Sequence, residues 1–340
     1  MYTKTIYWIV ALFLSVFLSQ QVQADERVTV DNFTRAETDR TMADYVKLGG
    51  FGKFYHIRKP TPLDEQKVVR MNLDTLYSFG VFDLSSPVTI TLPDSGDRFM
   101  SFLAINQDHS MLPVEYAPGE FTITQEQMGT RYAILVLRTF MDSTDPEDIK
   151  KANALQDRVT VAQAAKGSFD LPKWDEASLL KVRGALAVLA STTSDTSGFF
   201  GDKDKLDRLD FLMGTAAGWG GNPKEGAMYF TYSPEQNDGK TPFSVTIKDT
   251  PFEDKGFWSI TVYGEDNYLK PNDLGVNAFS NVTAEKDPDG SITINVGGCD
   301  NGRTNCIPAE PGWNYLLRVY RPKAGVLSGE WAPPEMQPSK

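Results

Sequence analysis

The chain has 340 residues, with 45 acidic and 34 basic side chains and a formal net charge of -11 at pH 7. This acidic excess, without any run rich in Lys or Arg, disfavours binding to nucleic acid or to anionic membrane surfaces, because both repel a negatively charged protein. The length is typical of two domains or one large one, each able to bury a hydrophobic core.

Residues 1–24 have the three parts of an export signal. Lys4 supplies the positive charge, residues 6–18 form the apolar stretch, and Ala24 ends a small-residue cleavage site. The apolar stretch is short for a membrane-spanning helix; a retained N-terminal anchor is the alternative. We therefore expect a periplasmic or secreted protein with no stable membrane span after signal cleavage.

The next part of the chain is predicted to be one helix followed by strands. Residues 32–48 have a helix pattern, with capping-box spacing between Thr34 and Glu37. Residues 88–92 alternate apolar and hydroxyl side chains, which indicates a half-buried strand, and residues 99–105 are continuously apolar, which indicates a strand covered on both sides. Two further strands, at 121–124 and 132–137, are expected to extend the same sheet.

A helical region should follow, because Asp145 and Pro146 are typical of a helix start. Apolar residues then repeat three times at helical spacing. The three sets are Ile149, Ala152, Leu155, Val159 and Ala162; Leu179, Val182, Leu186 and Leu189; and Leu206, Leu209, Met213 and Ala216. From residue 227 onward, short strand patterns return between Gly/Pro turns, as in an antiparallel sandwich or jelly roll.

These patterns predict an α+β, β-rich fold with two antiparallel β-sandwich or jelly-roll-like domains and a helical segment between them. The expected divisions are a signal peptide at 1–24, an N-terminal β-rich domain at 25–144, a helical connecting segment at 145–225 and a C-terminal β-sandwich domain at 226–340. The chain has two cysteines, Cys299 and Cys306. A local disulfide between them is favoured in an oxidising compartment. A homo-oligomer is left open.

Several stretches resemble a known bacterial family. Three in the first half are similar to domain of unknown function (DUF) 1254: FGKFYHIRKPTPLDEQKVVRMNLDTLYSFGVFDL, TLPDSGDRFMSFLAINQDHS and GTRYAILVLRTF. Three in the second half resemble its usual C-terminal partner, DUF 1214: GWGGNP, FWSITVYGEDNYLKPND and GGCDNGRTNCIPAEPGWNYLLRVYRP. The resemblance implies two β-rich domains joined by helices, usually in exported or periplasmic proteins, and no particular reaction. Leu73 and Ser110 depart from the family pattern, which often has a basic and an aromatic residue there.

A polar cluster precedes the first predicted strand. Arg70, Asn72 and Asp74 are spaced by two, so in an extended segment their side chains would point the same way. Such a row could hold a carboxylate or a sugar through the guanidinium fork and the amide. A buried ion-pair network that fixes the segment to its neighbour is the alternative.

A second polar cluster, Asn106, Asp108 and His109, follows the strand at 99–105. His109 could act as a general base, because histidine titrates near neutrality. The only other histidine is His56, and the two could bind a divalent metal together with Asp108 or Asp74. The alternative is that His109 is a hydrogen-bonded residue at a strand end and that His56 packs among aromatic side chains.

Aromatic residues are scattered through the second half, where they could form a sugar-binding surface or simply a core. Arg318 and Tyr320 share a strand face and could line a cleft between the domains. GxSxG, GxGxxG and P-loop patterns are missing from the sequence, which argues against a serine hydrolase of that type and against nucleotide cofactors.

Two functional hypotheses follow. The first is an exported hydrolase or lyase that acts on a small polar or saccharide-like substrate in a cleft between the domains or at a sheet end. Its expected catalytic residues are His56, Asp74, Asp108 and His109, and its expected substrate-binding residues are Arg70, Asn72, Asn106, Trp219, Arg318 and Tyr320. The second is a non-catalytic periplasmic ligand-binding or envelope-assembly module. No cofactor is identified, and a divalent metal is left open.

Overall fold

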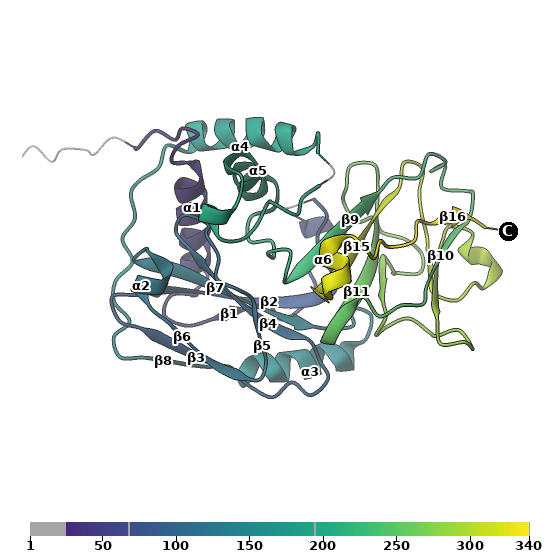
Figure 1. Cartoon of the computed structure of the whole chain (residues 1–340), viewed down its shortest axis with the longest axis horizontal. Coiled ribbons are helices and arrows are strands. Elements are labelled where there is room, and N and C mark those ends of the chain that lie inside the picture. Colours follow the sequence, from purple (N-terminus) through teal and green to yellow (C-terminus); the bar gives the residue numbers. More distant parts are fainter. Residues whose placement is uncertain (1–24, 67–68, 194, 340) are drawn as a thin grey trace, which may run out of the picture.

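The computed structural model describes residues 25–66, 69–193 and 195–339, so the predicted export signal at 1–24 lies outside the described residues. Figure 1 shows sheets and helices from the first two thirds of the chain on one side and a β-sandwich from the last third on the other. The predicted β-rich α+β fold is confirmed. Within the described ranges, no helix is both long and apolar enough to cross a membrane.

The N-terminal body contains two packed sheets. Apolar side chains alternate along the strands, so each strand sends one set of residues into the space between the sheets. The larger sheet has the order β1 (Tyr55–His56), β2 (Thr75–Asp83), β7 (Tyr132–Phe140), β4 (Met100–Asn106) and β5 (Glu115–Tyr116). The smaller sheet has the order β6 (Gly119–Ile123), β3 (Val88–Leu92) and β8 (Thr160–Gln163).

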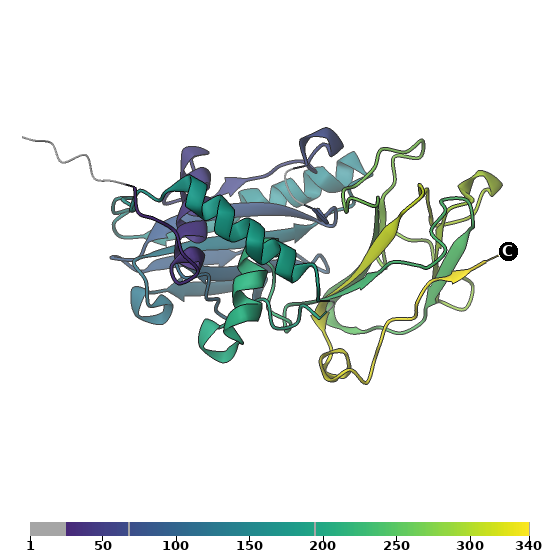
Figure 2. The same cartoon turned by 90° about the horizontal axis from the view of Figure 1, so that it is seen from above.

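Helices cover the other face of the larger sheet. Three of them, α1 (Phe33–Lys47), α4 (Glu176–Ala190) and α5 (Arg208–Gly218), share a small apolar core. Figure 2 shows α4 crossing over this layer. The alternate residues of β7 and β4 that face this layer form a second core with α1 and α5. This body therefore has two sheets and one layer of helices.

Three further α-helices and three 3-10 turns belong to the described part of the chain. The remaining α-helices are α2 (Gln125–Met128), α3 (Pro146–Asp157) and α6 (Ala324–Ser328). The 3-10 turns are η1 (Leu63–Glu65), η2 (Lys203–Lys205) and η3 (Cys299–Asn301). Asp145 caps α3 through a hydrogen bond from the Glu147 amide, as its sequence predicted.

The C-terminal body is a sandwich of two sheets around one apolar core. One sheet has the order β14 (Cys306–Ile307), β13 (Ile292–Val296), β10 (Phe243–Ile247) and β16 (Gln337–Pro338). The other has the order β12 (Ala278–Ser280), β11 (Phe252–Tyr263), β15 (Asn314–Pro322) and β9 (Ala227–Tyr232). The predicted disulfide between Cys299 and Cys306 is confirmed beside β14.

Aromatic rings join the two bodies. Phe99 and Phe140 from the larger N-terminal sheet lie 5.1 Å and 4.8 Å, between ring centres, from Phe257 on β11. Phe257 in turn stacks on Tyr320 of β15 at 4.3 Å. The rings of Phe99, Phe257 and Tyr320 are almost fully buried, so this contact fixes the N-terminal sheet against β11 and β15.

Three details of the sequence prediction were wrong. Thr34 and Glu37 form no capping box, because Asn32 is the N-cap residue and Glu37 pairs with Arg183 and Arg40. The first predicted apolar helix face does not reach Ala162, since residues 160–163 pair with β3 as strand β8. The strands after residue 88 also do not form a single sheet: β3 pairs with β6, whereas β4 pairs with β7.

Candidate functional site

His109 is enclosed in the interior. Its side chain has no exposed surface. Nε2 accepts a hydrogen bond from the Gly220 amide at 2.9 Å, and Nδ1 lies 2.8 Å from the Thr215 hydroxyl, which is also 2.9 Å from the Phe211 carbonyl. Burial lowers the pKa of His109 to about 3. These contacts describe a neutral imidazole that holds α5 and its following loop against the end of β4.

Asp108 and Asn106 organise the turn around His109. Asp108 forms ion pairs with Arg35 at 2.6 Å and with Lys203 at 2.9 Å. Burial works to raise the pKa of Asp108, but Lys203 and Arg35 outweigh it and keep the pKa below its ordinary value. The Asn106 side-chain oxygen accepts from the amides of Asp108 and Ser110. All of these contacts connect segments of the fold.

His56 lies on β1, the edge strand of the larger sheet that is separated from β4 by β2 and β7. Its Nδ1 is 2.7 Å from the Ser78 hydroxyl on β2. Burial, together with Arg58, lowers its pKa to about 4. His56 is therefore a neutral edge-strand residue under most conditions.

The segment with Arg70, Asn72 and Asp74 is not extended. Arg70 has a φ of 53° and donates from Nη2 to the Asn267 side chain at 2.8 Å. The Asn72 amide nitrogen lies 3.0 Å from the Tyr320 hydroxyl. Asp74 is 5% exposed and accepts a 2.6 Å hydrogen bond from Ser259. The three side chains thus contact different parts of the C-terminal body.

Arg318 and Tyr320 lie on the same face of β15, toward this segment. Arg318 donates to the hydroxyls of Thr261 and Tyr263 and to the carbonyl of Arg70. Burial raises the pKa of Asp74, and the charge of Arg318 opposes this. The structure therefore brings Arg70, Asn72, Asp74, Arg318 and Tyr320 into one network between the two bodies.

The four residues expected to be catalytic do not meet. Among the described residues, no hydrogen bond or ion pair links any two of His56, Asp74, Asp108 and His109, because each is bonded to a different partner. No three His, Cys, Asp or Glu side chains of the described ranges gather as a metal site would require. Trp219, expected to bind substrate, instead donates to Thr38 of α1 and packs beside His109.

Sequence analysis missed a polar row across the larger sheet. Arg138 on β7 is paired with Tyr77 on β2 and with Ser101 on β4, and directly paired residues share a face. Because side chains alternate along β7, Arg138 is on the same face as Ile134 and Val136, which is the face that the helices cover. A charged residue within the apolar run YAILVLRTF was the signal available in the sequence.

Arg138 is the charged centre of this row. Its Nη2 donates to the Gly220 carbonyl at 2.5 Å, and its guanidinium lies 5.4 Å from the centre of the Tyr77 ring. Burial works to raise the pKa of Tyr77, but Arg138 and the hydrogen bond from Asn72 outweigh it and lower the pKa. The guanidinium Nη1 and the Ser101 hydroxyl are buried without a hydrogen-bond partner among the described residues.

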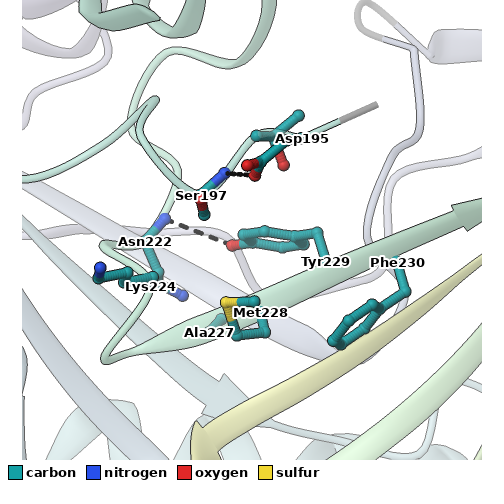
Figure 3. Close-up of a pocket in the computed structure, with 9 residues that line it drawn as sticks. Asp195, Ser197, Asn222, Lys224, Ala227, Met228, Tyr229 and Phe230 are labelled. Carbon is teal, nitrogen blue, oxygen red and sulfur yellow. Dashed lines mark hydrogen bonds between the residues drawn. The ribbon is translucent and has the colours of Figure 1, made fainter. Parts of the chain in front are cut away.

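A pocket of about 120 Å³ opens beside this row, between the loop after α5 and strand β9. Figure 3 shows the Tyr229 ring between Asp195 and Ser197 on one side and Met228 on the other. The pocket is lined by Asp195, Thr196, Ser197, Asn222, Lys224, Ala227, Met228, Tyr229 and Phe230. It therefore offers a cation, a carboxylate, an amide and an aromatic ring within a small volume.

Asn222 and Tyr229 connect the pocket to the polar row. The backbone N–H of Asn222 donates to the Tyr229 hydroxyl at 3.3 Å. Burial raises the pKa of Tyr229, and the charge of Arg138 opposes this. Asn222 is 3% exposed, and its side-chain oxygen has no hydrogen-bond partner among the described residues. The pocket and the row thus form one polar region between the bodies.

A second hollow, of about 10 Å³, lies beside Asp74. This volume is at the lower limit for a single water molecule. We therefore centre the candidate site on the larger pocket and the polar row behind it.

Comparison with known proteins identifies two families of unknown function and several solved structures, two of which are described below. The sequence model of DUF1254, described as a protein of unknown function, matches residues 51–163, and that of DUF1214, described likewise, matches residues 226–324. Among curated proteins, none matches this chain in sequence.

The VPA0106 protein from Vibrio parahaemolyticus is 18% identical, with a TM-score of 0.68 over 92% of this chain and 98% of that one. An uncharacterized protein from Burkholderia cenocepacia is 14% identical, with a TM-score of 0.51 over 91% of this chain and 88% of that one. At these identities the likeness describes the fold alone.

Proposed function

The chain belongs to the proteins in which a DUF1254 region is followed by a DUF1214 region. Its pocket is lined by residues of the segment between these two regions and by the first strand of the DUF1214 region, and we propose that the protein is an exported binding protein for a small polar ligand. The ligand would lie in the pocket beside β9, between Asn222, Lys224 and Tyr229.

The observation that carries this proposal is the side-chain oxygen of Asn222. Buried polar atoms in folded proteins nearly always have a hydrogen-bond partner, from the protein or from something bound to it. This oxygen has none among the described residues, and Asn222 forms part of the pocket wall. A ligand hydroxyl or amine would supply the missing donor.

The lining favours a small saccharide-like or hydroxy-acid ligand. Lys224 and Ser197 can donate hydrogen bonds, and Asp195 and Asn222 can accept them. The ring of Tyr229 provides an apolar surface between these groups, as seen in Figure 3. Such a mixture suits a compact molecule that carries several hydroxyl groups.

The test is a thermal-shift screen with sugars, sugar acids, hydroxy acids and amino acids, followed by calorimetry on Asn222→Ala. We expect a selected ligand whose affinity falls about tenfold or more in this variant, the equivalent of losing about 1.4 kcal/mol of binding free energy. Asn153→Ala is the matched control, because the side-chain oxygen of Asn153 also has no partner among the described residues but Asn153 is not part of the pocket lining. Unchanged affinity in Asn222→Ala would contradict the proposal.

A lyase is the second candidate function, and Tyr77 is the observation that favours it. A phenol with a lowered pKa, held by Asn72 beside Arg138, is suited to exchange a proton with a bound molecule. Elimination of water from a hydroxy acid or sugar acid breaks a C–H bond next to the carboxylate and a C–OH bond on the adjacent carbon, and it would create a conjugated double bond that absorbs ultraviolet light. We expect Tyr77→Phe to abolish such turnover while ligand binding persists; equal turnover in both proteins would exclude this role.

Export to the periplasm is part of the proposal. The sequence of residues 1–24 and the Cys299–Cys306 disulfide support it. Mass spectrometry of the protein from the periplasmic fraction should find an N-terminus at Asp25. Recovery of the full-length chain in the cytoplasmic fraction would contradict this location.

A further inference from the structure

Arg138 is a buried cation for which the described part of the chain supplies no acidic partner. The residue is 3% exposed, and no acidic side chain of the described ranges forms an ion pair with it. The other buried arginine of this region, Arg318, donates to Thr261, Tyr263 and a backbone carbonyl and lies close enough to Asp74 to influence its pKa. Arg138 donates to one carbonyl and lies against the ring and the hydroxyl of Tyr77, and its Nη1 has no hydrogen-bond partner among the described residues.

A second free group lies next to Arg138 in the same row. Ser101 is fully buried and directly paired with Arg138, so both side chains are on the helix-covered face of the sheet. The Ser101 hydroxyl has no partner among the described residues. Two unsatisfied groups that can donate, one of them charged, are costly to bury unless an acceptor joins them.

This row is connected to the pocket. The Gly220 carbonyl that accepts from Arg138 belongs to the same loop that supplies Asn222 to the pocket wall. Tyr229 lines the pocket and is influenced by the charge of Arg138. Arg138 and Ser101 do not line the pocket themselves, so the acidic group of a ligand would have to extend past Tyr229 to reach them.

We propose that Arg138 and Ser101 form an anion subsite that holds a carboxylate of the ligand through Nη1 and the serine hydroxyl. The inference rests on the proposed function for the remainder of the ligand and narrows the ligand class to acids, such as a hydroxy acid or a sugar acid. Arginine is suited to this role because its planar guanidinium pairs with the two oxygens of a carboxylate.

Acetate is the probe, because it presents the carboxylate without the rest of the ligand. We expect the melting temperature of the wild-type protein to rise with acetate concentration and to saturate, relative to sodium chloride at equal ionic strength. Ser101→Ala and Arg138→Gln should each weaken the affinity for acetate about tenfold or more. The absence of a saturable response in the wild type, or an unchanged response in both variants, would overturn the subsite.

Two matched controls isolate the geometry. Thr139→Val removes another buried hydroxyl that has no partner in the described part of the chain, but on the opposite face of β7. Arg158→Gln removes an exposed positive charge. Both should leave the acetate response unchanged. If Arg138→Gln does not fold, Ser101→Ala decides, because the Ser101 hydroxyl has no hydrogen-bond partner to lose within the ranges that the structure describes.

A third measurement examines whether an ionised Tyr77 neutralises the charge of Arg138. If Tyr77 were ionised and neutralised Arg138, the wild-type protein would show tyrosinate ultraviolet absorbance at neutral pH that Tyr77→Phe lacks, and the subsite would be overturned. We expect no such difference.

The two proposals fail separately. Loss of acetate binding in Ser101→Ala with unaltered binding of the screened ligand in Asn222→Ala would retain the subsite and refute the pocket. The reverse result would retain the pocket and refute the subsite.

Discussion

His109 provides a direct test of the physical reasoning, because its neutral form is part of the fold. In the folded protein its two ring nitrogens are occupied by the Gly220 amide and the Thr215 hydroxyl. Its pKa is lowered from 6.5 to about 3 by burial. The unfolded chain takes up a proton below pH 6.5 and the folded chain does not, so the stability from this residue is present above pH 6.5 and is lost as the pH falls.

The magnitude follows from the two pKa values. Each pH unit between 6.5 and about 3 removes about 1.4 kcal/mol of unfolding free energy. Between pH 7 and pH 5 the loss is therefore about 2 kcal/mol. The chain has two histidines, and His56 contributes in the same direction because its pKa is lowered to about 4.

The variant His109→Asn removes the titrating group and keeps a residue type that tolerates the positive φ of 68° at this position. We expect it to be less stable than the wild type at pH 7 and the deficit to shrink by about 2 kcal/mol at pH 5, in urea denaturation. Groups with raised pKa values, such as Asp39 and Asp74, act in the opposite direction but cancel in the difference.

Thr215→Val is the control, because it removes a partner of His109 and leaves the imidazole in place. Its destabilisation should be nearly the same at both pH values. A deficit of His109→Asn that stays constant from pH 7 to pH 5 would refute the reasoning and would mean that the folded protein accepts the proton at His109.

Three further predictions concern stability. Phe257→Ala should lower the unfolding free energy by about 3–5 kcal/mol, because the ring is 1% exposed at the junction of the two bodies; a loss below about 1 kcal/mol in chemical denaturation would contradict this packing. Joint replacement of Cys299 and Cys306 by Ser should cost about 2–3 kcal/mol for the short loop that the disulfide closes, and a reductant should then destabilise the wild type but not the variant. Asp83→Asn should lower the unfolding free energy by about 2 kcal/mol at pH 7, because the buried carboxylate accepts two hydrogen bonds from Arg131. These contacts hold the pKa of Asp83 well below the usual range. The difference between the variant and the wild type should therefore shrink at low pH, where the wild type loses this stability.

Strands were easier to predict than their partners. The alternating residues 88–92 and the continuously apolar residues 99–105 both form strands at nearly the expected positions. Side-chain periodicity reports which faces of a strand are buried, but not which neighbour it pairs with. The sequence therefore placed β3 and β4 in one sheet, whereas the structure pairs them with β6 and β7, respectively.

The error at the end of α3 has a related cause. Val159 and Ala162 continue the helical spacing of residues 149–155, yet the helix ends at Asp157. Residues 160–163 instead complete the edge of the smaller sheet opposite β6, where they gain a ladder of hydrogen bonds with β3. Pairing with β3 therefore outweighs the helical spacing, which only two residues beyond residue 155 continue.

The candidate site was only partly visible in the sequence for the same reason. The sequence indicates Arg70, Asn72 and Asp74 as a polar cluster because they are close together in the chain. Tyr77, Arg138 and Ser101 become one row only through strand register, which local spacing does not encode. When two polar residues that pair in the fold are far apart in sequence, the sequence indicates them only by a charge or a hydroxyl within an otherwise apolar strand.

The packing of the two bodies explains why the site needs both. The N-terminal sheet contributes Arg138 and Ser101, and β9 of the C-terminal sandwich contributes Tyr229. The rings of Phe99, Phe140, Phe257 and Tyr320 fix one sheet against the other close to this point. Neither body alone can therefore hold Arg138 and Ser101 against the pocket wall. A mutation that loosens the aromatic contact should weaken ligand binding although the mutated residue does not contact the ligand.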